Sequence, residues 1–372
     1  MQVSDLYSLL DKNHINFFCG VPDSLLKDFC AYIFDNTDNN IITANEGNAI
    51  GLAAGHFLST GYPACVYMQN SGLGNAINPL VSLTDKEVYN IPLLMIIGLR
   101  GEVGLKDEPQ HIKQGAITDK LLNVLGIKYE ILPKNFKYAR PIIESAIQYM
   151  NGTLEPFAFI IKKNTFDRYE FINKKIETST FAREEAIETV LSYLSEKDVI
   201  VSSTGFISRE IYEIREKTCE KHKQDFLVIG SMGHASSIAL GVALEKPDRN
   251  VFCLEGDGSF IMHEGVIGVI GSKNLNNYKH IVFNNEAHDS VGGWPTVASN
   301  INITKVAFYS GYKKIYSVSS KNELINVLPE FILNNSLSIL EIKVKCGAKS
   351  NLGRPKESTY ECKKNFMKNL LS

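Results

Sequence analysis

Short apolar segments alternate with longer, helix-length segments along the whole chain. The segments that we expect to form strands are residues 15–22, 40–43, 64–67, 93–97, 158–162, 199–202, 251–254, 280–283 and 339–344. Helix-length stretches lie between them, at 47–58, 139–150, 183–194, 235–244 and 264–273. Strands that alternate with helices of this length are typical of βαβ units, in which helices cover both faces of a parallel sheet. This pattern predicts an α/β protein with doubly wound parallel sheets.

Chain length and one change in composition indicate two domains. A chain of 372 residues corresponds to two or three domains at about 150 residues each. Residues 166–181 are charged, follow an expected buried strand and precede a new helix start. We therefore predict a first domain at 1–168, a linker at 169–181 and a second domain at 182–372.

Charge and composition argue against several classes of partner. Lys and Arg number 39 and Asp and Glu number 41, so the net charge of -2 gives no basic surface for nucleic acid or an anionic membrane. No apolar run approaches the roughly 20 residues of a membrane span, and the first residues lack a signal pattern. The seven cysteines (19, 30, 65, 219, 253, 346 and 362) form no CxxC pair, which favours reduced thiols. We expect a soluble, cytoplasmic protein.

The most informative segment is 251–293, where two polar groups follow two apolar strands. The first strand leads into Gly-Asp-Gly-Ser at 256–259, and the second ends at Asn284-Asn285. Because parallel strands end at the same sheet edge, we expect Asp257 and Asn285 to converge across the 28 positions that separate them. Oxygen ligands suit Mg²⁺, and the N–H groups of Gly258 and Ser259 suit a diphosphate. The GDG turn alone would be equally compatible with an ordinary strand-to-helix turn.

A GDG turn followed by Asn-Asn closely resembles the binding signature of thiamine-diphosphate enzymes. The resemblance implies a pyrimidine-binding domain followed by a diphosphate-binding domain. It also implies that Glu46, at the start of a helix of small residues, bonds N1′ of the aminopyrimidine, and that Met232 separates the two cofactor rings. By itself, Glu46 could be an acidic residue favoured by the helix dipole. The cofactor contacts so assigned are Glu46, Gly230, Ser231, Met232, Gly233, Asp257, Gly258, Ser259 and Asn285, and the Mg²⁺ ligands are Asp257, Asn285 and Ala287.

Five segments, from residue 20 to residue 355, are similar to the phosphonopyruvate decarboxylase family and its sulfopyruvate decarboxylase neighbours. They are residues 20–26, 69–75, 106–111, 284–293 and 347–355. The resemblance implies conversion of 3-phosphonopyruvate to phosphonoacetaldehyde and CO₂, as a carboxy-lyase of phosphonate biosynthesis. Two positions depart from the family pattern: Trp294 stands where Gln is expected, and Val103 where Pro is expected. The indole of Trp294 could reshape a substrate pocket.

Further candidates follow from the chemistry of a 2-oxo acid substrate. His111 is the first candidate for the proton transfer that completes the product, and His288 is the second. A phosphonate needs cationic partners, for which the candidates are Lys106, Arg209 and Arg354. Asp23 and Ser24 follow a strand-like segment and could reach the substrate. Each of these residues could instead be a solvated charge or a hydrogen-bonded loop residue.

The resemblance also implies a homodimer or a higher homo-oligomer, with active sites between subunits. Three alternatives remain open. The chain could be a sulfopyruvate decarboxylase or a carboligase with the same cofactor. It could be a cofactor-binding homologue without activity, although Glu46, Asp257 and Asn285 are all present. It could also be an unrelated nucleotide-binding protein, but it contains no GxGxxG or GxxxxGK[ST] motif.

Overall fold

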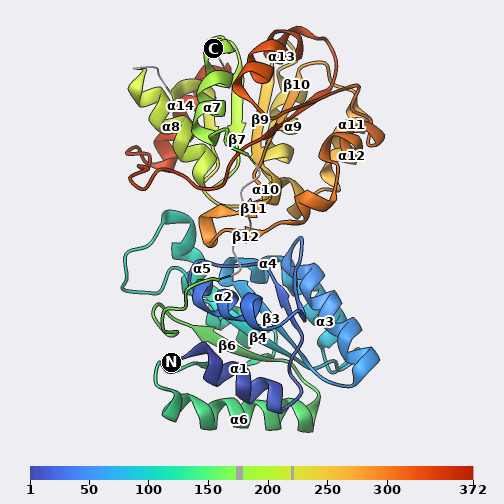
Figure 1. Ribbon diagram of the computed structural model, residues 1–372, viewed down its shortest axis with the longest axis vertical. Coiled ribbons are helices and arrows are strands. Elements are labelled where there is room, and N and C mark those ends of the chain that lie inside the picture. The colour runs from blue at the N-terminus through green and yellow to red at the C-terminus, as the bar shows by residue number, and fades with distance from the viewer. Residues whose placement is uncertain (173–178, 219–221, 372) are drawn as a thin grey trace. The chain divides into compact units, whose positions relative to one another are not determined.

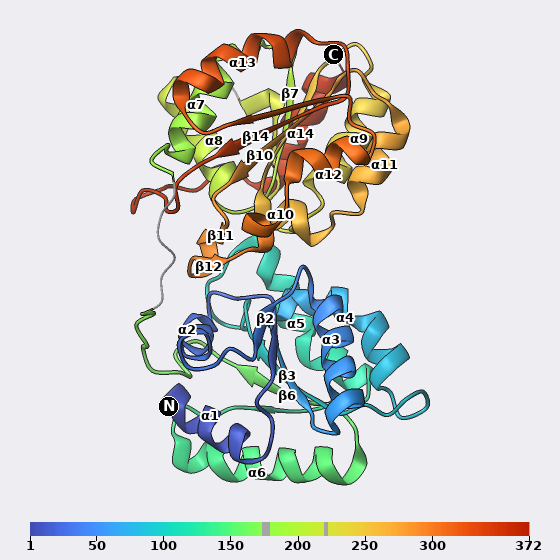
Figure 2. The ribbon, with the colours of Figure 1, turned by 45° about the vertical axis from the view of Figure 1, so that its right-hand side comes forward.

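The chain divides into two compact units, Met1–Lys175 and Ile176–Ser372. The computed structural model describes residues 1–172, 179–218 and 222–371. The predicted linker, 169–181, includes the division between the units, and its residues 173–178 lie outside the described residues, as does Cys219. In Figures 1 and 2 the first unit runs from blue to green and the second from green to red.

The first unit is built around a parallel six-stranded sheet with the strand order β2-β1-β3-β4-β6-β5. Helices α3, α4 and α5 supply the apolar side chains that pack on one face, whereas α1 contacts α2 and α6 (Figure 1). The strands are β1 (Phe18–Gly20), β2 (Asn40–Ile42), β3 (Ala64–Gln69), β4 (Leu93–Gly98), β5 (Lys128–Ile131) and β6 (Phe157–Ile161). The helices are α1 (Val3–Lys12), α2 (Lys27–Asn36), α3 (Glu46–Thr60), α4 (Leu73–Pro79), α5 (Pro109–Val124) and α6 (Phe136–Thr153).

The second unit repeats this architecture with the strand order β13-β14-β10-β9-β7-β8, again all parallel. Its strands are β7 (Val199–Ser202), β8 (Asp225–Leu227), β9 (Val251–Gly256), β10 (Tyr278–Asn284), β13 (Lys314–Val318) and β14 (Ser338–Lys343). A short antiparallel hairpin of β11 (Ala287–His288) and β12 (Trp294–Pro295) follows β10. The helices are α7 (Arg183–Tyr193), α8 (Phe206–Lys217), α9 (Ala235–Glu245), α10 (Asp257–Met262), α11 (Val266–Lys273), α12 (Ile303–Tyr309), α13 (Lys321–Leu333) and α14 (Thr359–Leu371).

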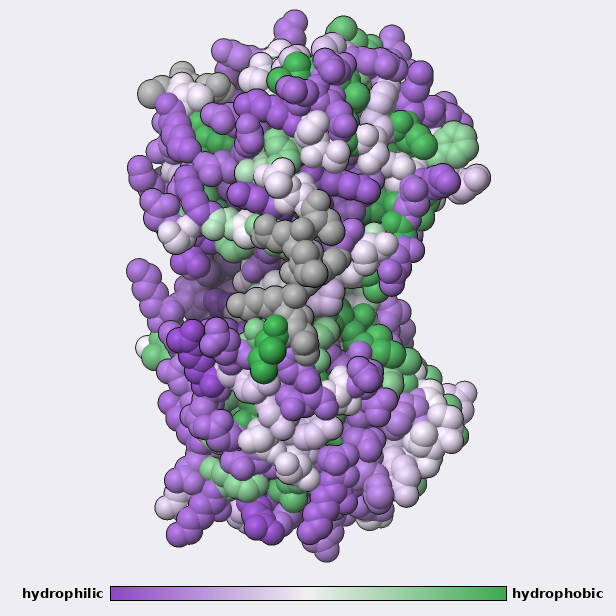
Figure 3. All heavy atoms as spheres, in the orientation of Figure 1, coloured by the Kyte–Doolittle hydropathy of each residue, from purple (hydrophilic) through white to green (hydrophobic). Residues whose placement is uncertain are grey.

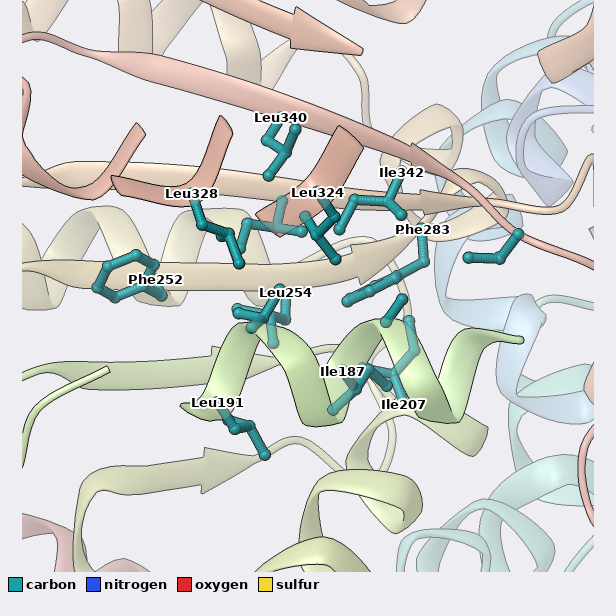
Figure 4. Packing of buried hydrophobic residues seen from close by; sticks show 14 of the residues in the cluster. Ile187, Leu191, Ile207, Phe252, Leu254, Phe283, Leu324, Leu328, Leu340 and Ile342 are labelled. Carbon is teal, nitrogen blue, oxygen red and sulfur yellow. The ribbon is translucent and has the colours of Figure 1, made fainter. Parts of the chain in front are cut away.

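The core of the second unit forms because three helices place apolar side chains on one face of the sheet. Figure 4 shows Ile187 and Leu191 from α7, Ile207 from α8, and Leu324 and Leu328 from α13. They pack against Phe252, Leu254, Phe283, Leu340 and Ile342 from the strands. Central strands buried on both faces are mostly apolar, which explains why the sequence predicts them, although β9, β10 and β14 also bury Glu255, Lys279, His280 and Glu341.

The structure confirms the predicted α/β class with two doubly wound parallel sheets, and every predicted strand and helix forms. Strands β5, β8 and β13 are absent from the sequence prediction, and all three lie at sheet edges. Most residues of β5 and β13 are exposed, so these strands lack the apolar run that marks a central strand.

The sequence also led us to expect no membrane span and reduced cysteines. Within the described ranges, no helix combines the length and the apolar character needed to cross a membrane. The face drawn in Figure 3 is mostly hydrophilic, with apolar side chains in small groups. The six cysteines in the described ranges are free.

Candidate active site

Asp257 begins α10 directly after β9, at the carboxyl edge of the second sheet. Its side chain is buried, and the Thr296 hydroxyl donates a hydrogen bond to Oδ2. Burial raises the pKa of the Asp257 carboxyl from 3.8 to about 7, although the Thr296 bond and nearby backbone N–H groups oppose the shift. Thr296 belongs to the site, and no sequence pattern singled it out.

The turn after β10 is held by side chains on both of its asparagines. Asn284 Nδ2 donates to Glu341 Oε1 at 2.7 Å, and its Oδ1 accepts from the Glu286 N–H at 3.0 Å. Asn285 Nδ2 donates to Asp289 Oδ2 at 2.7 Å, and its Oδ1 accepts from the Ala287 N–H at 3.1 Å. The backbone N–H of Asn285 also bonds the Asp257 carboxyl. The structure therefore brings Asp257 and Asn285 together, as the sequence predicts.

Two further predicted residues, His288 and Met232, meet beside Gly258. A Cβ atom at Gly258 would lie 2.8 Å from Cε1 of His288 and 3.3 Å from Cε of Met232, so only glycine fits between them. The loop 230–233 is joined to the same turn because the Gly233 N–H donates to Ser259 Oγ at 3.2 Å. Burial lowers the pKa of His288 to about 4, so its ring is neutral near pH 7.

A buried polar chain, which the sequence interpretation missed, runs behind this turn. Ser259 Oγ donates to Glu255 Oε2 at 2.7 Å, and Glu255 Oε1 lies 2.8 Å from His280 Nε2. His280 Nδ1 in turn lies 3.0 Å from the Tyr312 hydroxyl. The one sign of it in the sequence was Glu255, the acidic residue directly before the GDG turn. These hydrogen bonds orient the Ser259 hydroxyl, which accepts from the Gly233 N–H.

Arg209 and Arg354 occupy different surroundings. Arg209, on α8, donates from Nε to the Gly353 carbonyl at 2.8 Å and from Nη2 to the Leu352 carbonyl. It thereby holds residues 352–353 against α8, a packing role that the sequence did not predict. The Arg354 side chain is exposed. Substrate contacts for both residues remain predictions.

In the first unit, Glu46 is the first residue of α3 and is buried. Asn75 Nδ2 donates to Glu46 Oε2 at 2.8 Å, and burial raises the pKa of the carboxyl. Gly72 packs so closely that a Cβ atom there would overlap the Glu46 carboxyl group. Asn75 and Gly72 lie in a segment that the family resemblance quoted, but the sequence assigned them no role.

Asp23 lies beyond the end of β1 with no solvent exposure. Gln69 Nε2 donates to Asp23 Oδ1 at 2.5 Å, and the Leu25 N–H donates to Oδ2 at 3.0 Å. Burial raises the pKa of Asp23. Gly98, at the end of β4, leaves room for this carboxyl because a Cβ atom would overlap Oδ2.

Ser24 and His111 are joined through two residues that the sequence did not single out as site residues. Arg100 Nη1 donates to Ser24 Oγ at 2.9 Å, while Arg100 Nη2 lies 2.5 Å from Asp107 Oδ1. His111 Nδ1 lies 2.9 Å from the same Asp107 oxygen. Lys106, in contrast, is exposed. The polar groups at this edge of the first sheet therefore centre on Arg100 and Asp107.

Comparisons with known proteins match both units to one family. The model described as "Thiamine pyrophosphate enzyme, N-terminal TPP binding domain" matches residues 3–121, in the first unit. The corresponding C-terminal TPP binding domain matches residues 209–342, in the second unit.

Curated relatives match almost the whole chain. A phosphonopyruvate decarboxylase of Streptomyces viridochromogenes is 30% identical, with 98% of this chain and 93% of the relative covered. One from Streptomyces hygroscopicus is 29% identical over the same shares. A sulfopyruvate decarboxylase of Methanosarcina acetivorans is 26% identical, covering 97% of this chain and 96% of the relative. The chain belongs to the phosphonopyruvate decarboxylase family of thiamine pyrophosphate enzymes.

Trp294 stands where the family resemblance predicts Gln, and the structure shows how the indole is accommodated. Trp294 pairs with His288 across the hairpin and is only 2% exposed. Its indole N–H donates to the Val291 carbonyl at 3.1 Å. A Cβ atom at Gly292 would lie 2.7 Å from the indole nitrogen, so the ring packs directly on this glycine. In this family member the indole closes the hairpin that carries His288.

Proposed function

We propose that this chain catalyses the thiamine-diphosphate-dependent, non-oxidative decarboxylation of 3-phosphonopyruvate to phosphonoacetaldehyde and CO₂, in phosphonate biosynthesis. The observation that carries the proposal is the match to two phosphonopyruvate decarboxylases along 98% of the chain. A sulfopyruvate decarboxylase that aligns over 97% of the chain supports sulfopyruvate as the second candidate substrate. A carboligase activity with the same cofactor is the third.

The residues at both sheet edges fit the cofactor. When bound, thiamine diphosphate supplies the nucleophilic carbon and the electron sink for decarboxylation. The buried Glu46 carboxyl, with its raised pKa, would hold a proton shared with N1′ of the aminopyrimidine. Met232 would lie against the cofactor rings, with the Gly230 carbonyl and Ser231 and Gly233 beside it. The N–H groups of Gly258 and Ser259 would receive the diphosphate.

The donor set in the second unit fits Mg²⁺. The Asp257 carboxylate, the Asn285 amide oxygen and the Ala287 carbonyl are the hard oxygen ligands that this ion prefers. Among the described residues Asp257 has no cationic partner, and its raised pKa reflects a buried carboxyl without a counter-charge. A divalent cation would supply that charge.

Arg100 is the best-placed cation for the substrate's anionic end in the first unit. Its guanidinium is held by Asp107 and donates to Ser24 Oγ at 2.9 Å. Because Asp107 binds Nε and Nη2, the substrate's anionic group would meet the Nη1 side of the guanidinium, next to Ser24. Lys106, which is exposed, is the alternative cation. His111 and His288 are the proposed proton-transfer groups, and Asp23, Arg209 and Arg354 remain candidates for substrate contacts.

Assembly and location form part of the proposal. We infer a homodimer or higher homo-oligomer with active sites between subunits, as the family resemblance implies. We also propose a cytoplasmic location, which the lack of a CxxC pair and the composition of the sequence support.

The test measures CO₂ and aldehyde from 3-phosphonopyruvate, sulfopyruvate and pyruvate, with and without thiamine diphosphate and Mg²⁺. We expect cofactor-dependent phosphonoacetaldehyde and little turnover of the other acids. Faster turnover of sulfopyruvate would show that sulfopyruvate is the substrate, and the reaction would still be a decarboxylation. A ketol product would indicate a carboligase. Turnover that does not depend on the cofactor would refute the proposal.

Two variants test the residue roles in the same assay. Glu46→Ala should retain thiamine diphosphate in a calorimetric titration but lose turnover, because it removes only the N1′ partner. Asp257→Ala should lose Mg²⁺-dependent cofactor binding. Glu144→Ala, on the exposed side of α6, is the matched control. Activity of Glu46→Ala close to that of the control would refute the catalytic role of Glu46.

A further inference from the structure

Asp107 lies at the centre of a hydrogen-bond network in the loop after β4. Its Oδ1 accepts from Arg100 Nη2 at 2.5 Å and from the Glu108 N–H at 2.8 Å, and lies 2.9 Å from His111 Nδ1. Its Oδ2 accepts from the Gly101 N–H at 2.7 Å and from Arg100 Nε at 3.0 Å. One carboxyl group thus joins a guanidinium, two backbone amides and an imidazole.

These partners decide which nitrogen of His111 carries the proton. A backbone amide or a guanidinium can only donate, so four of the five contacts require Asp107 to be an acceptor. The hydrogen bonds from Arg100 hold the pKa of the Asp107 carboxyl well below its usual range. An ionised carboxylate has no proton to give, so His111 Nδ1 must donate. The neutral ring then has its free lone pair on Nε2, which has no hydrogen-bond partner among the described residues.

The backbone holds this arrangement rigidly. Gly101 has a φ of +72° and packs against the His111 carbonyl, where a Cβ atom would overlap it. A Cβ atom at Gly115 would overlap the Gly101 carbonyl in the same way. The loop therefore lies directly on the first turns of α5, and the His111 side chain is only 11% exposed. This packing fixes the backbone of both segments, and rotation of the ring away from Asp107 would break the contact between Nδ1 and Oδ1.

We propose that Asp107 is a positioning residue that selects the Nδ1–H tautomer of His111 and makes Nε2 the nitrogen that transfers a proton to the product. Its role in turnover rests on the proposed function, whereas the tautomer does not. Loss of CO₂ from a 2-oxo acid anion replaces the carboxylate with hydrogen, so each turnover takes one proton from solvent. Nε2 takes that proton from water and delivers it to the carbon that lost CO₂, where a C–H bond forms. The other proton stays on Nδ1, hydrogen-bonded to the Asp107 carboxylate, throughout.

The first test reads the tautomer directly, without substrate. The full chain is labelled with ¹⁵N-histidine, and spectra are recorded about two pH units above the ordinary histidine pKa of about 6.5, with His111→Gln to assign the signal. We expect a protonated Nδ1 and an unprotonated Nε2 in the wild-type protein. In Asp107→Ala nothing accepts from Nδ1, so the selection is lost and the Nε2–H tautomer should appear. A wild-type Nε2–H signal, or no change in Asp107→Ala, would overturn the proposal.

The second test asks whether Asp107 acts through His111. We expect Asp107→Ala to lower kcat by about 10- to 100-fold, because a misplaced acid–base group loses part of the roughly 10²- to 10⁴-fold that a positioned one contributes. Asp119→Ala, the same change on the exposed side of α5, should remain within twofold of the wild type. In the double variant Asp107→Ala/His111→Gln, kcat at saturating substrate should equal that of His111→Gln alone, whereas loss of the Arg100 contacts should raise KM. Multiplied effects would overturn the coupling. If no 2-oxo acid is turned over by the wild-type protein, the proposed function fails, while the NMR result still decides the tautomer.

Discussion

At the scale of single residues, the partners of a carboxyl group decide its protonation. Burial without a cation raises the pKa of Glu46 and of Asp257. Asp107 is also partly buried, but Arg100 lowers its pKa. The surroundings therefore give three carboxyl groups three different roles. Glu46 is suited to share a proton, Asp257 to bind a cation, and Asp107 to remain an anion.

The close packing of Gly72 on Glu46 gives a prediction at this scale. Gly72→Ala should lower the free energy of unfolding by about 1–3 kcal/mol, because the new Cβ overlaps the Glu46 carboxyl and displaces it from Asn75. Denaturant titration measures the change. Gly74→Ala is the matched control two residues away, since nothing lies within 4 Å of its Cβ position. This control should be neutral or stabilising by up to about 1 kcal/mol. Equal stability of the two variants would contradict the packing argument.

At the scale of elements, one arginine ties two helices to the turn that carries Asn285. Arg183, on α7, lies 2.9 Å from Glu210 Oε2 of α8 and 3.0 Å from Asp289 Oδ2. The same Asp289 oxygen accepts from Asn285 Nδ2 at 2.7 Å. The orientation of a proposed Mg²⁺ ligand therefore depends on a residue at the start of the second unit.

We expect Arg183→Met to reduce the free energy of unfolding by about 3–5 kcal/mol, because it leaves the buried Glu210 carboxylate and the partly buried Asp289 carboxylate without this cation. It should also weaken Mg²⁺ binding, measured by titration calorimetry. Arg140→Met removes an exposed pair with Glu144 on α6, and should cost about 0.5 kcal/mol or less. A similar small loss for both variants would show that Arg183 does not hold the turn.

The buried Lys279 in β10 gives a pH-dependent prediction. Burial lowers the pKa of Lys279 from 10.5 to about 8, and its Nζ donates to the Asn334 carbonyl at 2.5 Å. The unfolded chain binds this proton more tightly than the folded protein does. The contribution of Lys279 to the free energy of unfolding therefore increases as pH rises from about 8 to 10.5. Lys279→Met removes this pH-dependent contribution. Urea unfolding at several pH values should show wild-type stability rising relative to Lys279→Met over this range. A constant difference would contradict the shift.

At the scale of the whole molecule, each unit has its own sheet and its own apolar core. A chain with two cores can lose them separately, so unfolding of this protein need not be two-state. Amide hydrogen exchange with mass spectrometry resolves the two units.

We expect Gly72→Ala to speed exchange only in the first unit and Arg183→Met only in the second. Exchange that changes equally in both units with either variant would show that the chain unfolds as one body.

Addition of Mg²⁺ and thiamine diphosphate should slow exchange in α10 and at 285–289. A ligand that binds only the folded state stabilises it by about 2.7 kcal/mol at 100 times its Kd.

Features that depend on a local pattern of residues could be predicted before the structure was known. Central strands are mostly apolar because both of their faces are buried, the GDG turn and Asn285 come at the ends of two of them, and Glu46 begins a helix of small residues. The edge strands β5 and β13 and the links made by Arg183 and Arg100 were decided only by the tertiary structure. Ser24 and Arg100 are 76 positions apart, and Arg183 and Asp289 are 106 apart. Charged residues of this kind look like solvated surface charges in the sequence, and only the folded chain shows which of them meet.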